Sequence, residues 1–192
     1  DYTYGDELTS AGDNLMGLAF REDQGGFMAG LVAGKFSTSH KVACLGGIEI
    51  PAIKRFCNGF MKGMEYVCAQ DGHTDCETII NYAGSFGDPQ VGINAVEAIL
   101  TQQADVDVIF GAAGATGSAG IKYAAQTHGM YVIGVDQDEY KSTFKAGNEA
   151  ASNKILTSIL KRIDEAAHFA IKSTVDGTFE AKDYSFSLAN DA

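Results

Sequence analysis

Four short segments of the chain combine glycines with polar or aromatic side chains, and each directly follows an apolar run. They are residues 46–51, 81–89, 111–117 and 134–138. These segments offer backbone N–H donors, several carboxylates and the aromatic ring of Phe86, which are groups that could bind a ligand. If the apolar runs are parallel strands of one sheet, the four segments share the rim at which open α/β sheets bind ligands.

Asp136 and Phe86 are the rim side chains with the most specific chemistry. The Asp136 carboxylate closes an apolar run and could accept two hydrogen bonds from the hydroxyls of a sugar, or it could cap the next turn. Phe86 lies in a loop between Gly84 and Gly87. Its ring could stack on a planar ligand or simply anchor the loop. The residues alone leave both alternatives open.

The glycine-rich segment 111–117 lies between a predicted strand and a predicted helix, where N–H groups could cradle a polar ligand. Its spacing is Gly-x-x-Gly-x-x-Gly rather than the dinucleotide-binding Gly-x-Gly-x-x-Gly, and it lacks the Gly-Lys-Ser/Thr ending of a phosphate loop. The sequence therefore disfavours a nucleotide-phosphate site here.

Residue arrangements typical of catalysis are poor. The histidines lie outside the rim segments, at His40, His73, His128 and His168. Ser118 lacks the Gly-x-Ser-x-Gly spacing of a nucleophile elbow and is better placed in the first turn of a helix. The remaining rim carboxylates, Glu49, Asp88 and Asp138, are better explained as solvated or capping groups. We therefore expect a binding protein rather than an enzyme, with no cofactor and no metal site.

The elements that would position these residues alternate along the chain. Apolar runs bounded by glycine predict buried parallel strands at 41–46, 78–82, 106–111 and 131–135. Helical patterns fall at 23–36, 51–68, 89–103, 117–128 and 152–172. Pro51 and Pro89 stand where helices should begin. The alternation predicts an α/β fold, an open parallel sheet flanked by helices on both faces. Glycines at four-residue spacing on the first two helices predict close packing on the sheet.

The C-terminal part differs from this pattern. A polar stretch follows Asp136, then a predicted helix and a predicted strand at 184–188. We expect residues 14–147 to form a Rossmann-like ligand-binding lobe, 148–192 a crossover helix and strand that return to another lobe, and 1–13 a linker.

Composition excludes several classes of protein. Lys and Arg number 14 against 25 Asp and Glu, a net charge of −11, which argues against binding nucleic acid or an anionic membrane. The chain of 192 residues, 45% of them apolar, suffices for one sizeable core. No apolar stretch approaches the roughly 20 residues of a membrane-spanning helix.

The four cysteines, Cys44, Cys57, Cys68 and Cys76, form no C-x-x-C pair and have no histidine spaced to complete a zinc site. Cys68 and Cys76 flank a polar turn that could bring them together, which would leave Cys44 to pair with Cys57. Buried free thiols of a cytosolic protein are the alternative, and spacing alone does not decide between them.

Taken together, the rim segments resemble the basic membrane protein family, the purine-nucleoside receptor lipoproteins of bacterial ABC transporters. The resemblance lies in six motifs, at residues 20–30, 46–56, 81–89, 111–117, 133–136 and 156–162. It implies a type I periplasmic binding-protein fold, in which two α/β lobes hold a nucleoside in the cleft between them.

The resemblance also implies roles for individual residues. Phe86 matches the aromatic residue that stacks on the base, and Asp136 matches the carboxylate that holds the ribose hydroxyls. Gly114 matches a backbone contact, with Ala113 and Gly47 beside it. Lys161 matches a donor on the ribose side. The expected ligand is a purine nucleoside of the inosine, guanosine or adenosine class, bound without turnover.

The resemblance runs from about Asn14 to Asp191 and covers only the C-terminal lobe, so we expect half a cleft. The missing N-terminal lobe or a second copy of this chain would complete it, and a transporter or receptor is the expected further partner. The cysteines lie outside the family pattern and suggest a secreted variant with added disulfides, located outside the cell, in the periplasm or at a membrane surface. The alternative is a shortened secreted lobe that self-associates or binds another protein.

Overall fold

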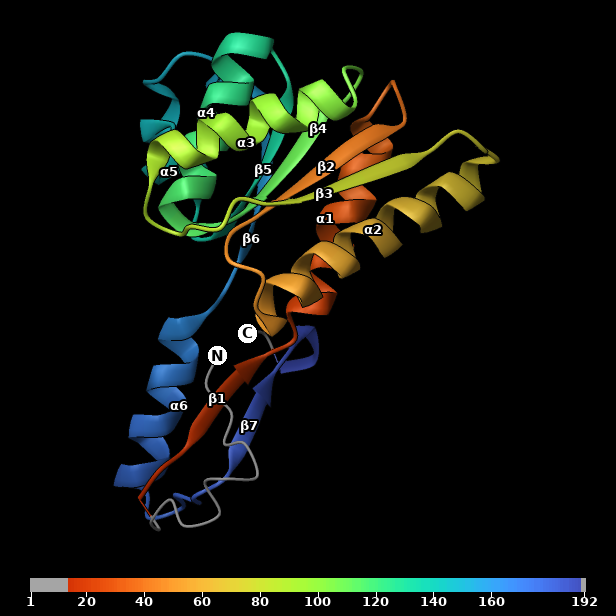
Figure 1. The fold of residues 1–192 in the computed structure, drawn as a ribbon. Coiled ribbons are helices and arrows are strands. Elements are labelled where there is room, and N and C mark those ends of the chain that lie inside the picture. The colour runs from red at the N-terminus through yellow and green to blue at the C-terminus, as the bar shows by residue number, and fades with distance from the viewer. Residues whose placement is uncertain (1–13, 191–192) are drawn as a thin grey trace. The chain divides into compact units, whose positions relative to one another are not determined.

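The computed structural model describes residues 14–190 and divides them into two compact units (Figure 1). Residues 22–160 form the larger unit, which carries the four rim segments. The smaller unit consists of the described residues on either side of it. The predicted linker, residues 1–13, lies outside the described residues.

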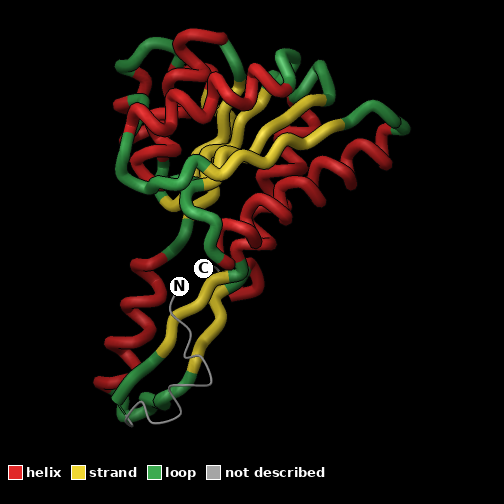
Figure 2. Tube along the Cα trace, in the orientation of Figure 1, coloured by secondary structure: helices red, strands yellow, loops and turns green. Residues whose placement is uncertain are grey.

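The larger unit is built on a five-stranded parallel sheet with the strand order β3-β2-β4-β5-β6. The strands are β2 (Lys41–Gly46), β3 (Glu77–Tyr82), β4 (Val108–Ala112), β5 (Tyr131–Asp136) and β6 (Ile155–Leu160). The helices are α1 (Glu22–Phe36), α2 (Pro51–Asp71), α3 (Pro89–Gln102), α4 (Gly114–His128) and the short α5 (Glu139–Ser142). The predicted open parallel sheet with helices on both faces is confirmed (Figure 2).

Alternation along the strands divides the core into two layers. Side chains of successive strand residues point to opposite faces, so Val42 and Cys44 belong to one cluster and Ala43 and Leu45 to the other. The first cluster includes side chains of α1 and α2, and the second includes side chains of α3 and α4. Figure 1 shows these two helix pairs on opposite faces of the sheet. Burial on both faces explains why these strands read as unbroken apolar runs.

Helix boundaries follow the expected local chemistry. Pro51 and Pro89 begin α2 and α3, as predicted. The Asp88 carboxylate accepts hydrogen bonds from the backbone N–H groups of the first turn of α3, which confirms its predicted capping role. Helices α2 and α4 end at Gly72 and Gly129, which adopt the left-handed conformation that glycine tolerates best.

The predicted helix over residues 152–172 is wrong in its first half. Residues 155–160 form β6, which pairs with β5, and helix α6 (Ile163–Val175) begins only after Arg162. The apolar residues of β6 happen to be four apart, which imitates a helical stripe. Its isoleucines and threonine favour a strand, and pairing with β5 satisfies the backbone. The larger unit therefore ends at Leu160, whereas we placed the boundary after residue 147.

The smaller unit pairs β1 (Gly17–Phe20) with β7 (Asp183–Phe186) in parallel, beside α6. Phe186 holds these elements together, because its ring centroid lies 5.4 Å from that of Phe20 and 5.8 Å from that of Phe169 on α6. The strand predicted at 184–188 is thus confirmed as β7, with shifted ends.

The glycine stripes of the first two helices face each other, not the sheet as predicted. A Cβ added at Gly63 of α2 would overlap the carbonyl oxygen of Phe27 on α1 and lie 2.9 Å from the Cα of Gly30. A Cβ added at Gly59 would likewise lie only 2.9 Å from the backbone nitrogen of Phe27 on α1. The two helices therefore touch backbone to backbone, which leaves no room for side chains between them.

Both predicted disulfides are present. Cys44–Cys57 joins β2 to α2 within the core, where both residues are fully buried. Cys68–Cys76 joins the last turns of α2 to the residue just before β3. The bridges therefore attach α2 to the sheet near both of its ends.

We expect Gly63→Ala to lower the free energy of unfolding by about 1–3 kcal/mol, because the new methyl group must push α1 and α2 apart. This loss outweighs the gain in helix propensity, which is about 1 kcal/mol for Gly to Ala. Urea denaturation measures the effect. Gly87→Ala is the matched control, since a Cβ there meets nothing within 4 Å, and it should change stability by less than about 0.5 kcal/mol. Equal stability of the two variants would show that the helices are not in close contact.

Candidate ligand-binding site

The loops at the carboxyl ends of the strands are hydrogen-bonded to one another across neighbouring strands. The N–H of Gly47, after β2, donates to the Ala112 carbonyl at the end of β4, with 3.0 Å between nitrogen and oxygen. Toward β3, the N–H of Ala83 donates to the Gly46 carbonyl at 2.8 Å, and the N–H of Gly84 donates to the Gly47 carbonyl at 3.1 Å. The loops after β3, β2 and β4 thus form one continuous rim.

Phe86 lies within this rim, between two glycines. A Cβ added at Gly47 would collide with the Phe86 ring, and one added at Gly114 would lie 3.0 Å from the Phe86 carbonyl oxygen and 3.6 Å from its Cβ. The ring is half-buried. Three of the predicted site residues are therefore brought together, and glycine is needed at 47 because the aromatic ring occupies the space of a side chain.

Thr116 anchors the loop that carries Phe86. Its backbone N–H donates to the Phe86 carbonyl at 3.2 Å, and its buried hydroxyl oxygen accepts from the Asp88 N–H at 2.9 Å. The Ser85 hydroxyl lies 3.3 Å from the same Thr116 oxygen. The loop after β3 is thus tied to the first turn of α4. We did not single out Thr116 from the sequence, because one threonine in a glycine-rich segment gives no signal.

The start of α4 presents backbone rather than side chains. Ala113 occupies the N-cap position, is fully buried, and offers no side-chain cap. Gly114 follows with φ of 55°, in the left-handed region that favours glycine. The start of this helix carries partial positive charge from its N–H groups, which attracts ligand oxygens.

Asp136 ends β5, the strand next to β4, and its side chain is exposed. Its φ is 65°, a backbone conformation uncommon for residues other than glycine, although Asp and Asn adopt it more readily than most. Strained backbone of this kind tends to persist at ligand sites. Asp138, two residues later, caps α5 by accepting from the Lys141 N–H at 3.4 Å, which confirms the capping role predicted for it.

A buried carboxylate supports the loop after β5. Glu139 is 2% exposed and accepts a hydrogen bond from the Ser118 hydroxyl on α4 at 2.7 Å and another from Thr143. Its own N–H donates to the Ser158 hydroxyl on β6 at 3.1 Å. Glu139 therefore joins the loop to α4 and β6. Nothing in the sequence indicated that this acidic residue would be buried. Ser118 lies in α4, as predicted, and serves this support.

At the other side of the rim, Glu49 pairs with Lys54 at 3.0 Å. The hydrogen bond from Lys54 to Glu49 raises the pKa of the Lys54 ammonium. Partial burial, followed by the nearby charge of Glu49, raises the pKa of the Tyr82 hydroxyl, so the tyrosine stays neutral. Glu49 and Lys54 therefore form an ion pair at this part of the rim, not an acid–base pair for catalysis.

Lys161 lies in the smaller unit, directly after β6. Its Nζ lies 4.9 Å from the centroid of the Phe20 ring, over the ring face. The contact is a cation–π interaction between two residues of the smaller unit. Lys161 thus differs from the other predicted site residues, which all belong to the larger unit.

A depression of about 340 Å³ lies beside the edge strand β6. Its lining residues are Asp138, Tyr140, Ile155, Leu156, Thr157, Ser158 and Leu160. None of the predicted ligand residues lines it. We take the rim as the candidate site, because Phe86 packs against Gly47 and Gly114 there and Asp136 ends the strand next to β4.

Comparison with known proteins identifies the family. Residues 1–191 match the family described as ABC transporter substrate-binding protein PnrA-like. The chain belongs to this family. It is 32% identical over 169 residues to basic membrane protein B of Borreliella burgdorferi, covering 88% of this chain and 45% of that protein. It is 29% identical to a CD4+ T-cell-stimulating antigen of Listeria innocua, covering 91% of this chain and 49% of that protein.

Solved structures show the same fold. An ABC transporter solute-binding protein of Aeropyrum pernix K1 superposes with a TM-score of 0.76 at 30% identity, over 93% of this chain and 48% of that one. A transcriptional activator of the comK gene from Bacillus halodurans has a TM-score of 0.72 at 22% identity, over 92% of this chain and 55% of that one, and shows the fold alone. The fold is that of a type I periplasmic binding protein, as predicted. The chain spans about half the length of the curated relatives it matches, which fits one lobe.

Within residues 14–190, no helix is both long enough and apolar enough to cross a bilayer.

We expect Thr116→Val to weaken the anchoring of the Phe86 loop while preserving the shape of the side chain. The Asp88 N–H would lose its 2.9 Å acceptor, so the free energy of unfolding should fall by about 1 kcal/mol and the Asp88 amide should exchange its hydrogen faster. Urea denaturation and hydrogen exchange measure the two effects. Thr101→Val on the exposed face of α3 is the control and should change neither. Unchanged exchange at Asp88 in the Thr116 variant would contradict this account of the loop.

Proposed function

We propose that this chain is the C-terminal lobe of a solute-binding protein for purine nucleosides and that it binds them at the rim without turnover. The position of Phe86 carries the proposal. Its half-buried ring lies against Gly47 and its backbone lies close to Gly114, so it offers a flat apolar surface that contacts within the chain already hold in place. A purine base has a π-face suited to such a surface, and stacking tolerates any base.

The remaining rim groups complement a nucleoside. The exposed Asp136 carboxylate has acceptor oxygens only, which suits the paired 2′ and 3′ hydroxyls of ribose. The start of α4, at Ala113 and Gly114, would donate backbone hydrogen bonds to the base or sugar. Lys161 is the proposed donor on the ribose side. With a net charge of −11, the chain favours a neutral nucleoside over a nucleotide.

Family membership supports transport as the setting of this binding. The proposed partners are a second lobe that closes over the ligand and a membrane transporter that receives it. Two disulfides suit an oxidising compartment, so we propose a secreted, periplasmic or membrane-surface location.

Titration calorimetry of the chain with inosine, guanosine and adenosine, raised to millimolar concentration, tests the proposal. We expect Phe86→Ala to weaken nucleoside binding by about 5- to 150-fold, the equivalent of about 1–3 kcal/mol for loss of a stacked base. We expect Asp136→Asn to weaken it by about tenfold or more, because the charged acceptor is lost while asparagine keeps the left-handed backbone.

Two matched variants serve as controls for these changes. Tyr140→Ala removes an exposed aromatic ring beside the depression, and Asp138→Asn neutralises the other carboxylate after β5. Neither should alter affinity. The site assignment is wrong if both rim variants bind like the unaltered chain, and the lobe does not carry the site if no nucleoside produces heat.

A second candidate function is self-association through α6. This helix exposes three large apolar residues to solvent: Ile163 is 59% exposed, Ile171 65% and Val175 80%. Contiguous exposed apolar surface of this kind often marks a protein interface. A depression of about 350 Å³ lies between α6 and β7 and is lined in part by Phe169, Tyr184 and Phe186, which also suits a partner.

If α6 mediates association, sedimentation velocity should show a dimer whose fraction rises with protein concentration. Ile171→Asp should shift the equilibrium toward monomer, because a charge replaces an apolar contact. Met28→Asp on α1, where the side chain is 43% exposed, makes the same change outside the proposed interface and should leave the dimer intact. A monomer at every concentration would remove this candidate.

A further inference from the structure

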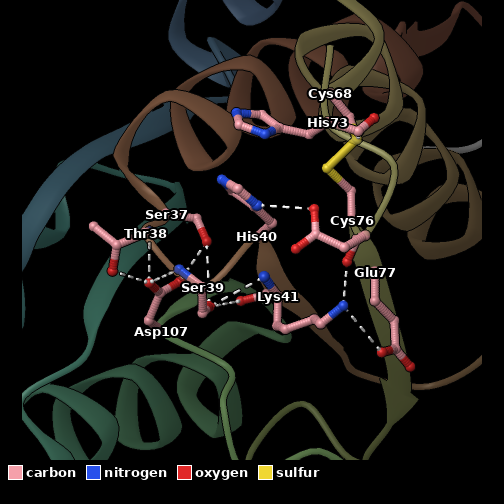
Figure 3. Close-up of polar contacts among 11 residues, drawn as sticks. Ser37, Thr38, Ser39, His40, Lys41, Cys68, His73, Cys76, Glu77 and Asp107 are labelled. Carbon is pink, nitrogen blue, oxygen red and sulfur yellow. Dashed lines mark hydrogen bonds and ion pairs between the residues drawn. A yellow bond between two sulfur atoms is a disulfide. The ribbon is translucent and has the colours of Figure 1, made fainter. Parts of the chain in front are cut away.

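Three metal-ligating side chains meet at the end of the sheet opposite to the rim. His40 lies just before β2, and His73 lies in the loop between α2 and β3 (Figure 3). Asp75 lies in the same loop. Each offers one ligand atom, and the three atoms lie within 4.8 Å of one another. Parallel pairing of β2 with β3 brings the residues together, since the starts of the two strands lie side by side.

Contacts within the cluster are already close. His40 Nδ1 lies 3.0 Å from a carboxylate oxygen of Asp75. The rings of His40 and His73 are neighbours, tilted by 35° with 3.8 Å between their centroids (Figure 3). Ligand atoms around a tetrahedral zinc ion, with bonds of about 2.0–2.2 Å, are roughly 3.3–3.5 Å apart. The three groups must therefore approach by little more than about 1 Å. His73 and Asp75 are exposed, so their side chains can rotate to do so.

The backbone that carries His73 and Asp75 is held on both sides. Helix α2 ends at Gly72 in the left-handed conformation, and the N–H of His73 then donates back to the Cys68 carbonyl at 3.0 Å. The Cys68–Cys76 disulfide closes the segment that contains both ligands. A loop closed in this way loses less entropy when it binds a metal.

The backbone around His40 is held as well. The Asp107 carboxylate, at the start of β4, accepts from the Ser37 hydroxyl at 2.6 Å and from the Thr38 and Ser39 N–H groups at 2.7 and 3.0 Å. Burial alone would raise the pKa of Asp107, but these hydrogen bonds outweigh it and lower that pKa. The His40 carbonyl in turn accepts from the Glu77 N–H at 2.9 Å.

Charges around the cluster favour a cation. The Asp75 carboxylate lies 3.0 Å from His40 Nδ1 and supplies negative charge beside the imidazoles. Lys35 pairs with Asp71 at 2.6 Å, and Lys41 lies 3.8 Å from Glu77 and donates to the Asp75 carbonyl oxygen. Both lysines are thus paired with other carboxylates, which leaves the Asp75 side-chain oxygens to the imidazoles.

We propose that His40, His73 and Asp75 bind one zinc ion. Two neutral imidazoles and a carboxylate are a ligand set that suits zinc, while magnesium and calcium prefer oxygen ligands. Three protein ligands leave a fourth position for water. The ion would bridge the side chains of His40, His73 and Asp75. It would also join the start of β2 to the loop before β3, beside the disulfide.

Titration calorimetry of the oxidised full chain with Zn²⁺, after treatment with a chelator, tests the proposal. We expect one equivalent to bind, because the three ligand atoms lie within 4.8 Å of one another. His40→Gln, His73→Gln and Asp75→Asn should each weaken binding by about tenfold or more. Mg²⁺ should produce no binding, and Co²⁺ should give the visible absorption of a tetrahedral site.

His128→Gln is the matched control. His128 also pairs with an exposed carboxylate, that of Glu97, with 2.9 Å between the two atoms. Among the described residues, this pair has no third metal-ligating side chain close enough to complete a site. This variant should bind zinc like the unaltered chain. Circular dichroism confirms that each variant is folded. The proposal is overturned if folded His40, His73 and Asp75 variants keep full zinc affinity, or if the unaltered chain binds no zinc at millimolar concentration.

Discussion

Parallel pairing of the five strands of the larger unit is the constraint on which the other features depend. It places every carboxyl end at one edge of the sheet and every amino end at the other, with β2 between β3 and β4. Phe86, Gly47 and Gly114 meet at the first edge although they follow three different strands. His40 and the loop before β3 meet at the second edge for the same reason. Both proposed sites are therefore consequences of strand order.

Polar groups of the rim are held by buried contacts that do not need a ligand. Thr116 binds the loop after β3, and Glu139 joins the segment after β5 to Ser118 on α4. On the face of the sheet that α1 and α2 cover, these two helices touch each other through glycines. The Cys44–Cys57 disulfide attaches α2 to β2. The rim is thus held by contacts within the chain, which lowers the entropic cost of ordering it around a ligand.

The sequence predicted the sheet well because its strands are buried on both faces and appear as apolar runs bounded by glycine. It failed at β6, where apolar residues four apart imitated a helix and only pairing with β5 decides the structure. The glycine stripes were noticed, but spacing alone could not tell whether they face the sheet or another helix.

The rim residues could be predicted from the sequence because they directly follow the predicted strands, and that position places them at the edge where such sheets bind ligands. Thr116 and Glu139 escaped notice because a single polar residue carries no pattern. The zinc ligands escaped for another reason. His40 is far from His73 and Asp75 along the chain, so no spacing motif joins them, and only the pairing of β2 with β3 does.

The most direct test of the central claim, that the rim binds a nucleoside, is an NMR titration of the ¹⁵N-labelled chain with inosine. The account predicts that the amide signals of Gly47, Phe86 and Gly114 shift together with a single affinity, while those of His40 and Glu77 at the opposite edge stay in place. Shifts confined to other surfaces, or no shifts at millimolar inosine, would contradict it.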